Sequence, residues 1–183
     1  MADVAHLKSL LGVHPDFPKK GITFLDIFPI LRNPVAFEFL ITHFVYHLTS
    51  QTIPQSPTKK IDVIVGLDAR GFLLGPIIAA RLGAAFVPVR KRGKLPGKVV
   101  SATYEKEYGA DSFEMQEDAI KPGQNVVVVD DLIATGGSAK AAGQLVNKLG
   151  GKVLEYLFVI ELPFLKGAQH LDAPTYSLIQ ADD

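Results

Sequence analysis

The sequence predicts an α/β protein whose central, mostly parallel sheet is flanked by helices. The first observation is the run 126–129, four consecutive valines, which is typical of a strand buried on both faces. The second is that apolar strand patterns alternate with helical patterns along the chain, as in parallel sheets. We expect helices over 72–82 and 139–149, and sheet strands over 61–66, 85–89, 126–129, 152–160 and 176–179.

Composition narrows the class of protein. The chain has 183 residues and 48% hydrophobic content, which suits one domain over 1–183 with a core at 60–161. Lys+Arg and Asp+Glu both number 19, so the basic excess of a nucleic-acid binder is missing. There is no cysteine for a disulfide or thiolate metal site. No signal pattern or membrane-length apolar run is visible, so we expect a cytoplasmic protein that binds neither nucleic acid nor membrane.

The elements between these strands follow from local signals. Asn33 and Pro34 predict a helix start, with an apolar face continuing to about residue 50. His43 and His47 are spaced to share a metal, but we favour a structural role because no acid follows the first histidine. Residues 50–59 read as a surface connector. Residues 100–103 and 112–116 predict two antiparallel strands.

The stretch 130–138 carries the clearest chemistry. Asp130 and Asp131 follow the four valines, and a loop of small residues then leads into a helix: Ala134, Thr135, Gly136, Gly137 and Ser138. Glycine amides, hydroxyls and a helix N-terminus suit a phosphate, whereas the carboxylates suit sugar hydroxyls or the water shell of a cation. The pattern is neither a P-loop nor a dinucleotide fingerprint. We interpret it as a sugar-phosphate site, the alternative being an ordinary acidic turn.

Two further loops follow predicted strands. Asp68, Ala69 and Arg70 come after the strand at 61–66, and the guanidinium of Arg70 is a planar donor suited to pyrophosphate. Residues 90–98 hold five basic side chains, Lys94 among them, and a multiply charged anion is a fitting partner. The alternatives are an arginine in a surface turn, a solvated basic loop and a nucleic-acid patch.

Two irregular segments are open to two interpretations each. Residues 14–29 interrupt all periodicity with prolines and aromatic side chains, as either a packed connector or the wall of a site for a flat apolar ligand. Residues 104–111 form the polar end of the predicted hairpin, as either an exposed loop or a mobile flap that closes over a site.

The stretch VVVVDDLIATGGS resembles the phosphoribosyl pyrophosphate signature of the type I phosphoribosyltransferases. FPKKGITFLDIFP, IVGLDARGF, VPVRKRGKLPG, YEKEYG and LFVIELPFLKGAQHL are similar to segments of the members that act on adenine. The resemblance implies the type I fold, with a small N-terminal hood at 1–34 that binds the base. It also implies conversion of adenine and phosphoribosyl pyrophosphate to AMP and pyrophosphate, with Mg²⁺, in a homodimer.

The resemblance also implies roles for individual residues. The loop 134–138 would hold the 5′-phosphate, and Asp130 and Asp131 the ribose hydroxyls. Arg70, Lys94 and a cis-prone peptide at Asp68–Ala69 would face the pyrophosphate. Thr23 and Leu25 would bind the edge of adenine through their backbones, with Phe24 beside them. Glu107 and Tyr108 would lie on the flap, and Glu107 would meet adenine at N7.

One departure from the family pattern is Leu25, where several relatives carry arginine. Reading of adenine by the backbone survives this change, but an arginine contact is lost. Two other functions stay open on the sequence: an enzyme of the same fold for another base, such as a 6-oxopurine, and a regulatory protein that binds these ligands without turnover.

Overall fold

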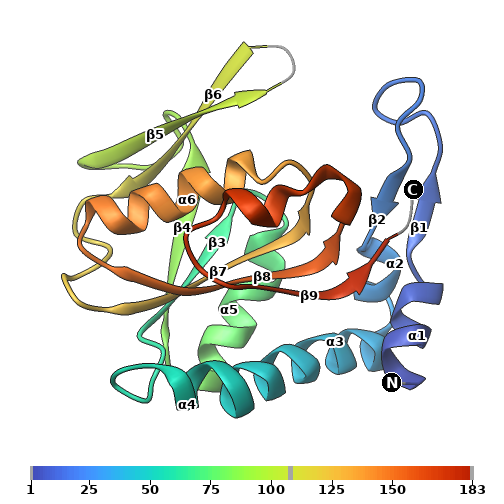
Figure 1. Ribbon diagram of the computed structural model, residues 1–183, viewed down its shortest axis with the longest axis horizontal. Helices are drawn as coiled ribbons and strands as arrows, with labels where there is room; N and C mark the ends of the chain where they lie inside the picture. The colour runs from blue at the N-terminus through green and yellow to red at the C-terminus, as the bar shows by residue number, and fades with distance from the viewer. Residues whose placement is uncertain (1, 107–108, 182–183) are drawn as a thin grey trace. The chain divides into compact units, whose positions relative to one another are not determined.

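A computed structural model describes residues 2–106 and 109–181 (Figure 1). The chain forms two compact units, residues 1–44 and 45–183, and each is described by itself. The first unit is longer than the predicted segment 1–34 because it includes most of a long helix. In the part of the chain that the structure describes, no helix is long and apolar enough to span a membrane.

The N-terminal unit is a small hairpin with helices on either side of it in the chain. Helix α1 (Ala2–Ser9) precedes β1 (Gly12–His14), which pairs antiparallel with β2 (Phe24–Asp26). Helices α2 (Phe28–Leu31) and α3 (Pro34–His47) follow. Asn33 caps α3, because its Oδ1 accepts hydrogen bonds from the amides of Val35 and Ala36 at 3.2 and 3.1 Å. The predicted helix start is therefore confirmed.

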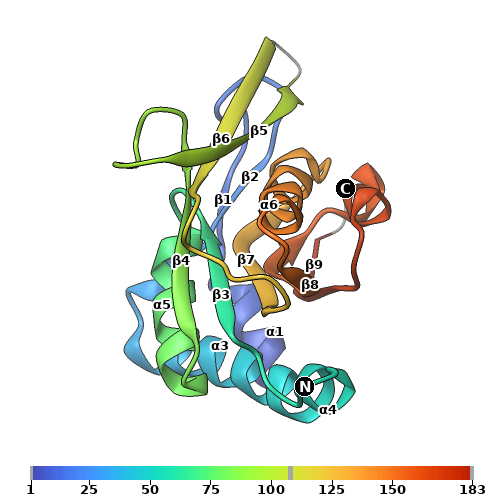
Figure 2. The same ribbon diagram turned by 90° about the vertical axis from the view of Figure 1, so that its left-hand side faces the viewer.

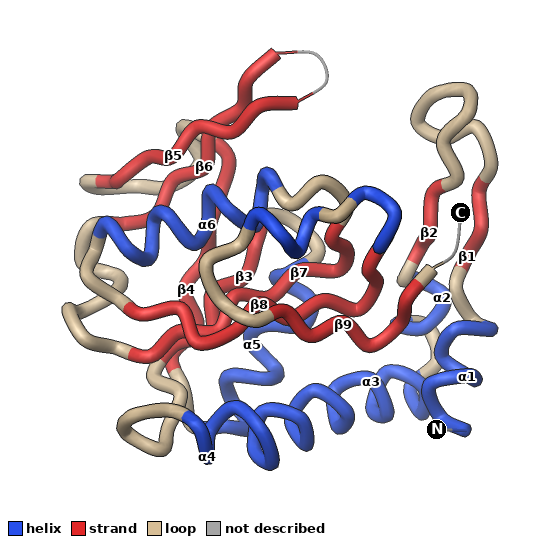
Figure 3. Tube along the Cα trace, in the orientation of Figure 1, coloured by secondary structure: helices blue, strands red, loops and turns tan. Residues whose placement is uncertain are grey.

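The second unit is organised by a seven-stranded sheet in the order β5-β6-β4-β3-β7-β8-β9 (Figure 3). β3, β4, β7, β8 and β9 run parallel, whereas the β5–β6 hairpin is antiparallel and joins the sheet through β4. The strands are β3 (Val63–Leu67), β4 (Ala85–Lys91), β5 (Val99–Lys106), β6 (Gly109–Gln116), β7 (Asn125–Ile133), β8 (Lys152–Glu161) and β9 (Thr175–Gln180). The predicted mostly parallel sheet is confirmed.

The two long helices of this unit cover opposite faces of the sheet (Figure 2). Helix α5 (Gly71–Leu82) connects β3 to β4, and α6 (Gly137–Lys148) connects β7 to β8, on the other side of the sheet order. Since parallel crossovers are right-handed, connections that leave in opposite directions place their helices on opposite faces. The direction changes between β3 and β7, and this switch point is where open α/β sheets bind ligands.

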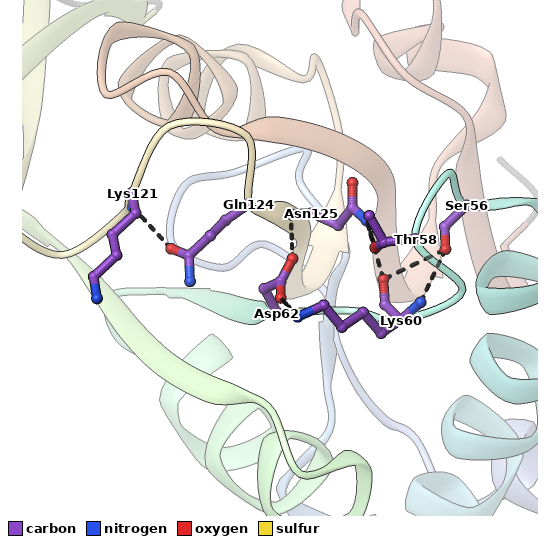
Figure 4. Close-up of polar contacts among 7 residues, drawn as sticks. All are labelled: Ser56, Thr58, Lys60, Asp62, Lys121, Gln124 and Asn125. Atoms are coloured by element: carbon purple, nitrogen blue, oxygen red, sulfur yellow. Dashed lines mark hydrogen bonds and ion pairs between the residues drawn. The ribbon is translucent and has the colours of Figure 1, made fainter.

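A polar network fixes the amino ends of β3 and β7, remote from this switch point (Figure 4). Asn125 is 2% exposed, and its Nδ2 donates to Thr58 Oγ1 at 2.7 Å and to the Lys60 carbonyl at 3.2 Å. Asp62 accepts from the Asn125 amide at 2.8 Å and pairs with the Lys60 amine at 2.7 Å. The hydrogen bond from Lys60 lowers the pKa of Asp62 against the opposing effect of burial, and the Asn125 amide also contributes. The network therefore sets the register of the two strands that carry the site.

Three expectations about element bounds were wrong. The strand at 126–129 continues through the acidic pair to Ile133, because Asp130, Leu132 and Ile133 keep their pairing with β8. The hairpin ladder extends through Tyr104↔Asp111 to Lys106↔Gly109, so most of the predicted loop is paired strand. The predicted connector 50–59 starts with a π-helical turn (Leu48–Thr52) and a short α4 (Ile53–Gln55). The last connection holds 3₁₀ turns η2 (Pro163–Leu165) and η3 (Gly167–His170).

Candidate active site

The loop between β7 and α6 lies at the carboxyl end of the central strand. Gly136 adopts φ +81°, a left-handed conformation that favours glycine, and α6 begins at the next residue. The loop is held from behind by Gly167 of η3, where an added Cβ would meet the Ala134 carbonyl and approach the Gly136 nitrogen to 2.8 Å. The loop thus has one tightly packed backbone shape.

This loop presents backbone donors. The amides of Thr135, Gly136 and Gly137 donate no hydrogen bond to any other residue that the structure describes. The first amides of a helix have no partner within the helix, so the start of α6 adds further donors of the same kind. Thr135 is exposed, and Ser138 is partly exposed. The predicted phosphate-binding residues are therefore gathered in one cradle of amides and hydroxyls.

The acidic pair lies at the edge of the same loop. It contacts Arg70, which comes from the loop between β3 and α5. Asp131 is 4% exposed, and its carboxylate accepts a hydrogen bond from Nε of Arg70. Asp130, which is partly exposed, accepts the Asp131 amide at 2.9 Å. Burial, and next the negative charge of Asp131, raise the pKa of Asp130 well above its usual range, and the positive charge of Arg70 only partly offsets this. The site therefore holds one ion-paired carboxylate and one that resists ionisation.

The loop that carries Arg70 is positioned by close backbone packing. Gly71 is the first residue of α5. A Cβ added there would lie 2.5 Å from the Val129 carbonyl oxygen and 3.2 Å from the carbonyl carbon of Gly66. This contact brings the start of α5 against β3 and β7, so Arg70 comes within reach of Asp131. The preceding Asp68–Ala69 peptide is cis, as the resemblance implied.

Arg90, at the end of β4, joins this loop to the basic one. Its Nε donates to Asp68 Oδ2 at 3.1 Å, and its Nη1 donates to the Lys94 carbonyl at 3.2 Å. The guanidinium also lies over the ring of Phe72, 5.9 Å from its centre. Lys94 itself is exposed. The two loops expected to meet a pyrophosphate are thus fastened to each other.

The predicted base-binding residues belong to the N-terminal unit. Phe24 and Leu25 lie in β2, with Thr23 just before it. The Phe24 ring packs edge-on against that of Phe17, with centres 5.2 Å apart, so the long β1–β2 loop has an aromatic cluster of its own. In a two-stranded antiparallel sheet, half of the backbone groups of each strand point away from the partner strand.

Two residues that shape the site were not predicted from the sequence, and two predicted residues are not tested by the structure. Gly167 and Arg90 had no assigned role, although Gly167 falls inside a family-like segment and Arg90 directly follows an apolar strand. Gly167 packs against Ala134 and Gly136, and Arg90 donates to Asp68, and no local pattern reveals these contacts between residues distant in sequence. Glu107 and Tyr108 lie outside the described residues, so their predicted roles stay predictions.

The donor set allows a magnesium ion that is held mainly by a substrate. Among the described residues, no group of three or more His, Asp or Glu side chains is arranged to hold a metal by itself. Mg²⁺ is commonly bound through one or two carboxylates together with substrate phosphates. Asp130 and Asp131, beside a phosphate-type loop, fit this second arrangement.

Comparison with known proteins agrees with this geometry. Residues 34–173 match the model of the phosphoribosyl transferase domain. The chain therefore belongs to the phosphoribosyltransferase family.

More particular likenesses cover nearly the whole chain. A Yarrowia lipolytica protein named adenine phosphoribosyltransferase is 59% identical over 97% of this chain and 95% of its own length. The crystal structure of the Saccharomyces cerevisiae adenine phosphoribosyltransferase, complexed with an imino-altritol bisphosphate and adenine, has a TM-score of 0.93 and 54% identity, covering 97% of this chain and 99% of that one. The crystal structure of the Trypanosoma brucei adenine phosphoribosyl transferase, in complex with AMP, pyrophosphate and ribose-5-phosphate, has a TM-score of 0.87 at 29% identity. The match covers 98% of this chain and 80% of that one. Within its family, the chain belongs to the adenine phosphoribosyltransferases, which transfer a pentosyl group.

Proposed function

We propose that this enzyme converts adenine and phosphoribosyl pyrophosphate to AMP and pyrophosphate, through an oxocarbenium-like transition state. The observation that carries the proposal is the amide cradle of 135–137 beside the acidic pair, in a chain 59% identical to an adenine phosphoribosyltransferase. The reaction breaks the bond from ribose C1 to the pyrophosphate oxygen, which keeps the electron pair. The lone pair of adenine N9 forms the new bond to C1, and the N9 proton is lost.

The loop residues Ala134 to Ser138 hold the 5′-phosphate in this proposal. Their amides donate to phosphate oxygens, and the hydroxyls of Thr135 and Ser138 add two donors. Because these contacts are remote from C1, they fix the ribose without changing during the reaction. Their value lies in orienting C1 between the base and the leaving group.

The acidic pair and the basic loops divide the charge that develops in the transition state. Asp130 and Asp131 accept hydrogen bonds from the ribose hydroxyls, and the negative charge of Asp131 lies near the positive ribose, joined by that of Asp130 once the bound substrate favours its ionised form. Arg70 and Lys94 stabilise the negative charge on the departing pyrophosphate, with Asp68 and Ala69 supplying the turn that presents Arg70. The Arg70–Asp131 ion pair links the two sets.

Mg²⁺, bound with the substrate, would neutralise part of the pyrophosphate charge. Asp130 and Asp131 are the residues that would hold it through its water shell. A cation or a hydroxyl donor arriving with the substrate would favour the ionised form of Asp130, whose pKa burial raises in the free protein.

Glu107 and Tyr108 are proposed to act from the hairpin, with Glu107 accepting or relaying the proton of the base. Hairpin closure would exclude the water that otherwise hydrolyses the same intermediate. Glu107→Gln should lower kcat and flatten its dependence on pH, and unchanged kcat at every pH would end this assignment.

The choice of adenine is assigned to the backbone of Thr23 and Leu25, with Phe24 against the base. The test offers the purified enzyme phosphoribosyl pyrophosphate and Mg²⁺ with adenine, hypoxanthine or guanine, and detects the nucleotide formed. AMP from adenine, with little product from the two 6-oxopurines, supports the proposal. A 6-oxopurine used in preference to adenine, or nucleotide binding without any product, would favour one of the two other functions.

A homodimer in the cytoplasm is also proposed, on the resemblance to the family. Light scattering on the purified protein tests the assembly, where a dimer has twice the chain mass of 19.8 kDa. A mass equal to one chain would contradict it.

A further inference from the structure

Glu114 of β6 is a buried carboxylate to which the proposed reaction assigns no role. It is 6% exposed. Two other carboxylates that are similarly buried, Asp131 and Glu155, are bound by side chains. Glu114 instead accepts a backbone hydrogen bond, because the amide nitrogen of Gly93 lies 2.9 Å from its Oε2. Burying a carboxylate is unfavourable unless it is hydrogen-bonded, and a bond from an amide to a charged oxygen is a strong one.

This hydrogen bond is made to the start of the basic loop. Strand β4 leaves the sheet opposite Glu114, since Arg90 and Lys91 are its residues paired with β6 and Arg90 faces Glu114. Gly93 follows with φ +77°, a left-handed conformation that favours glycine. A Cβ added at Gly93 would meet nothing within 4 Å, so no packing holds the turn there. Hydrogen bonds therefore fix the shape of this turn.

Strand β6 is a firm support for the turn. It lies between β5 and β4 in the sheet order (Figure 3), and Glu114 is paired with Ser101 of β5 as well as with Arg90 of β4. The same strand accepts a second hydrogen bond from the loop, because the Arg92 amide donates to the Ser112 carbonyl at 3.0 Å. The carboxylate of Glu114 and the Ser112 carbonyl thus attach two consecutive amides of the loop to β6.

Lys94 is the next residue of this loop, and its place depends on the backbone. Its amide donates to the Lys91 carbonyl at 3.2 Å, and its carbonyl accepts from Arg90 at 3.2 Å. Among the described residues, its amine has no hydrogen-bond or ion-pair partner. We propose that Glu114 is a positioning residue, which holds Lys94 at the pyrophosphate by fixing the Gly93 amide. The inference rests on the role of Lys94 in the proposed function.

The two effects that a carboxylate could have at this place are opposite in sign. If Glu114 acted only through its negative charge, removing the charge would strengthen pyrophosphate binding. If it acts by positioning Lys94, losing the acceptor weakens pyrophosphate binding. E114M removes the acceptor while keeping an unbranched side chain of similar volume, which suits a buried site. E114Q removes the charge but keeps an acceptor oxygen.

Binding is measured by calorimetry on the whole protein with Mg²⁺, using pyrophosphate and AMP, which has the 5′-phosphate but no pyrophosphate. E114M should weaken pyrophosphate binding about tenfold, or about 1.4 kcal/mol, and leave AMP affinity within about twofold of the parent. E114Q should keep most of the pyrophosphate affinity. E117A, which removes an exposed acid just after β6, is the matched control and should bind pyrophosphate as the parent does or slightly more tightly.

A double-variant cycle tests whether Glu114 acts through Lys94. K94A should itself weaken pyrophosphate binding, and adding E114M to K94A should then change the affinity by less than about twofold. In turnover assays, E114M should raise the KM for phosphoribosyl pyrophosphate and leave the KM for adenine unchanged. A full tenfold loss on adding E114M to K94A would show that Glu114 does not act through this lysine.

Other results would also overturn the proposal. Pyrophosphate affinity in E114M that equals or exceeds that of the parent would show that Glu114 acts through charge or packing alone. An equal loss of AMP affinity would show a general structural role, and E114Q binding as weakly as E114M would show that the acceptor oxygen is not what matters. A parent that binds no pyrophosphate at millimolar concentration would remove the site that Lys94 serves.

Two further outcomes are kept separate. Absence of product from adenine would contradict the proposed function alone, since the binding comparison still decides the role of Glu114. If E114M does not fold, hydrogen exchange at the Gly93 amide of the parent decides instead. Slow exchange at this exposed residue supports the contact, and exchange at the rate of a free peptide overturns it.

Discussion

Gly167→Ala is the substitution that most sharply separates a positioned phosphate loop from an incidental one. The added methyl group would meet the Ala134 carbonyl, the Gly136 nitrogen at 2.8 Å and the Thr135 carbonyl carbon at 2.9 Å. These are backbone atoms, so they relieve the overlap only by moving the loop. Overpacking of this kind costs about 1–3 kcal/mol. We expect the displacement to appear in the contacts with the 5′-phosphate.

Since about 1.4 kcal/mol corresponds to a factor of ten, kcat/KM for phosphoribosyl pyrophosphate should fall by roughly ten- to a hundredfold in Gly167→Ala. The KM for adenine should change little. Steady-state assays that vary each substrate in turn measure both, and thermal unfolding records the loss of stability.

Gly150→Ala is the matched control, because this glycine has φ +80° and a Cβ there would meet Pro122 at 3.3 Å, far from the loop in sequence. It should cost about 1–2 kcal/mol of stability and leave kcat/KM near that of the parent. The reasoning is refuted if Gly167→Ala loses stability like Gly150→Ala but keeps its kcat/KM for phosphoribosyl pyrophosphate.

Four further predictions concern charge and buried polar groups. Burial raises the pKa of Asp130, so the free protein loses stability as pH rises from the unfolded pKa through the folded one. Asp130→Asn should therefore raise stability at pH 7.5, with no gain near pH 3, while phosphoribosyl pyrophosphate binds less tightly. Thermal melts at several pH values decide this, and a loss of stability at pH 7.5 would contradict it. Asn125→Ala should cost about 1–3 kcal/mol of unfolding free energy in urea titrations with KM unchanged, because two buried hydrogen bonds are lost. Asp62 has a lowered pKa, so its contribution to folding stability is present above the unfolded pKa and is lost as pH falls through the folded one. Lys60→Met should therefore flatten the acid side of the profile of stability against pH. An unchanged profile would count against the ion pair. Arg70→Lys keeps the charge but loses the planar donor, so kcat should fall roughly tenfold, and an enzyme with parental kcat would show that the guanidinium geometry is dispensable.

Local patterns predicted the elements whose cause is local. The four valines of β7 are all fully buried, and β-branched apolar runs of this kind have few alternatives to a central strand. The cap at Asn33 was also predictable, since its hydrogen bonds reach only two and three residues along the chain. The acidic pair and the small loop after it could be placed at a strand end for the same reason.

Contacts between distant residues explain what the sequence could not reveal. The Arg70–Asp131 pair spans 61 positions, and the packing of Gly167 behind Gly136 depends on how η3 returns to the start of α6. The acids are part of β7 because β8 continues the ladder beside them, and no pattern within 126–133 shows how far a neighbour extends. The sequence therefore placed the acidic pair and the small loop near the end of a strand, whereas the structure identified the distant residues that pack against them.

The central claim is that the cradle at 134–138 holds the 5′-phosphate, with the acidic pair on the ribose. A crystal structure of the protein with ribose 5-phosphate tests it most directly. We predict phosphate oxygens within hydrogen-bonding distance of the amides of Thr135, Gly136 and Gly137, and ribose hydroxyls at Asp130 and Asp131. A phosphate bound instead at the Arg70 loop, with the cradle holding only water, would contradict the account.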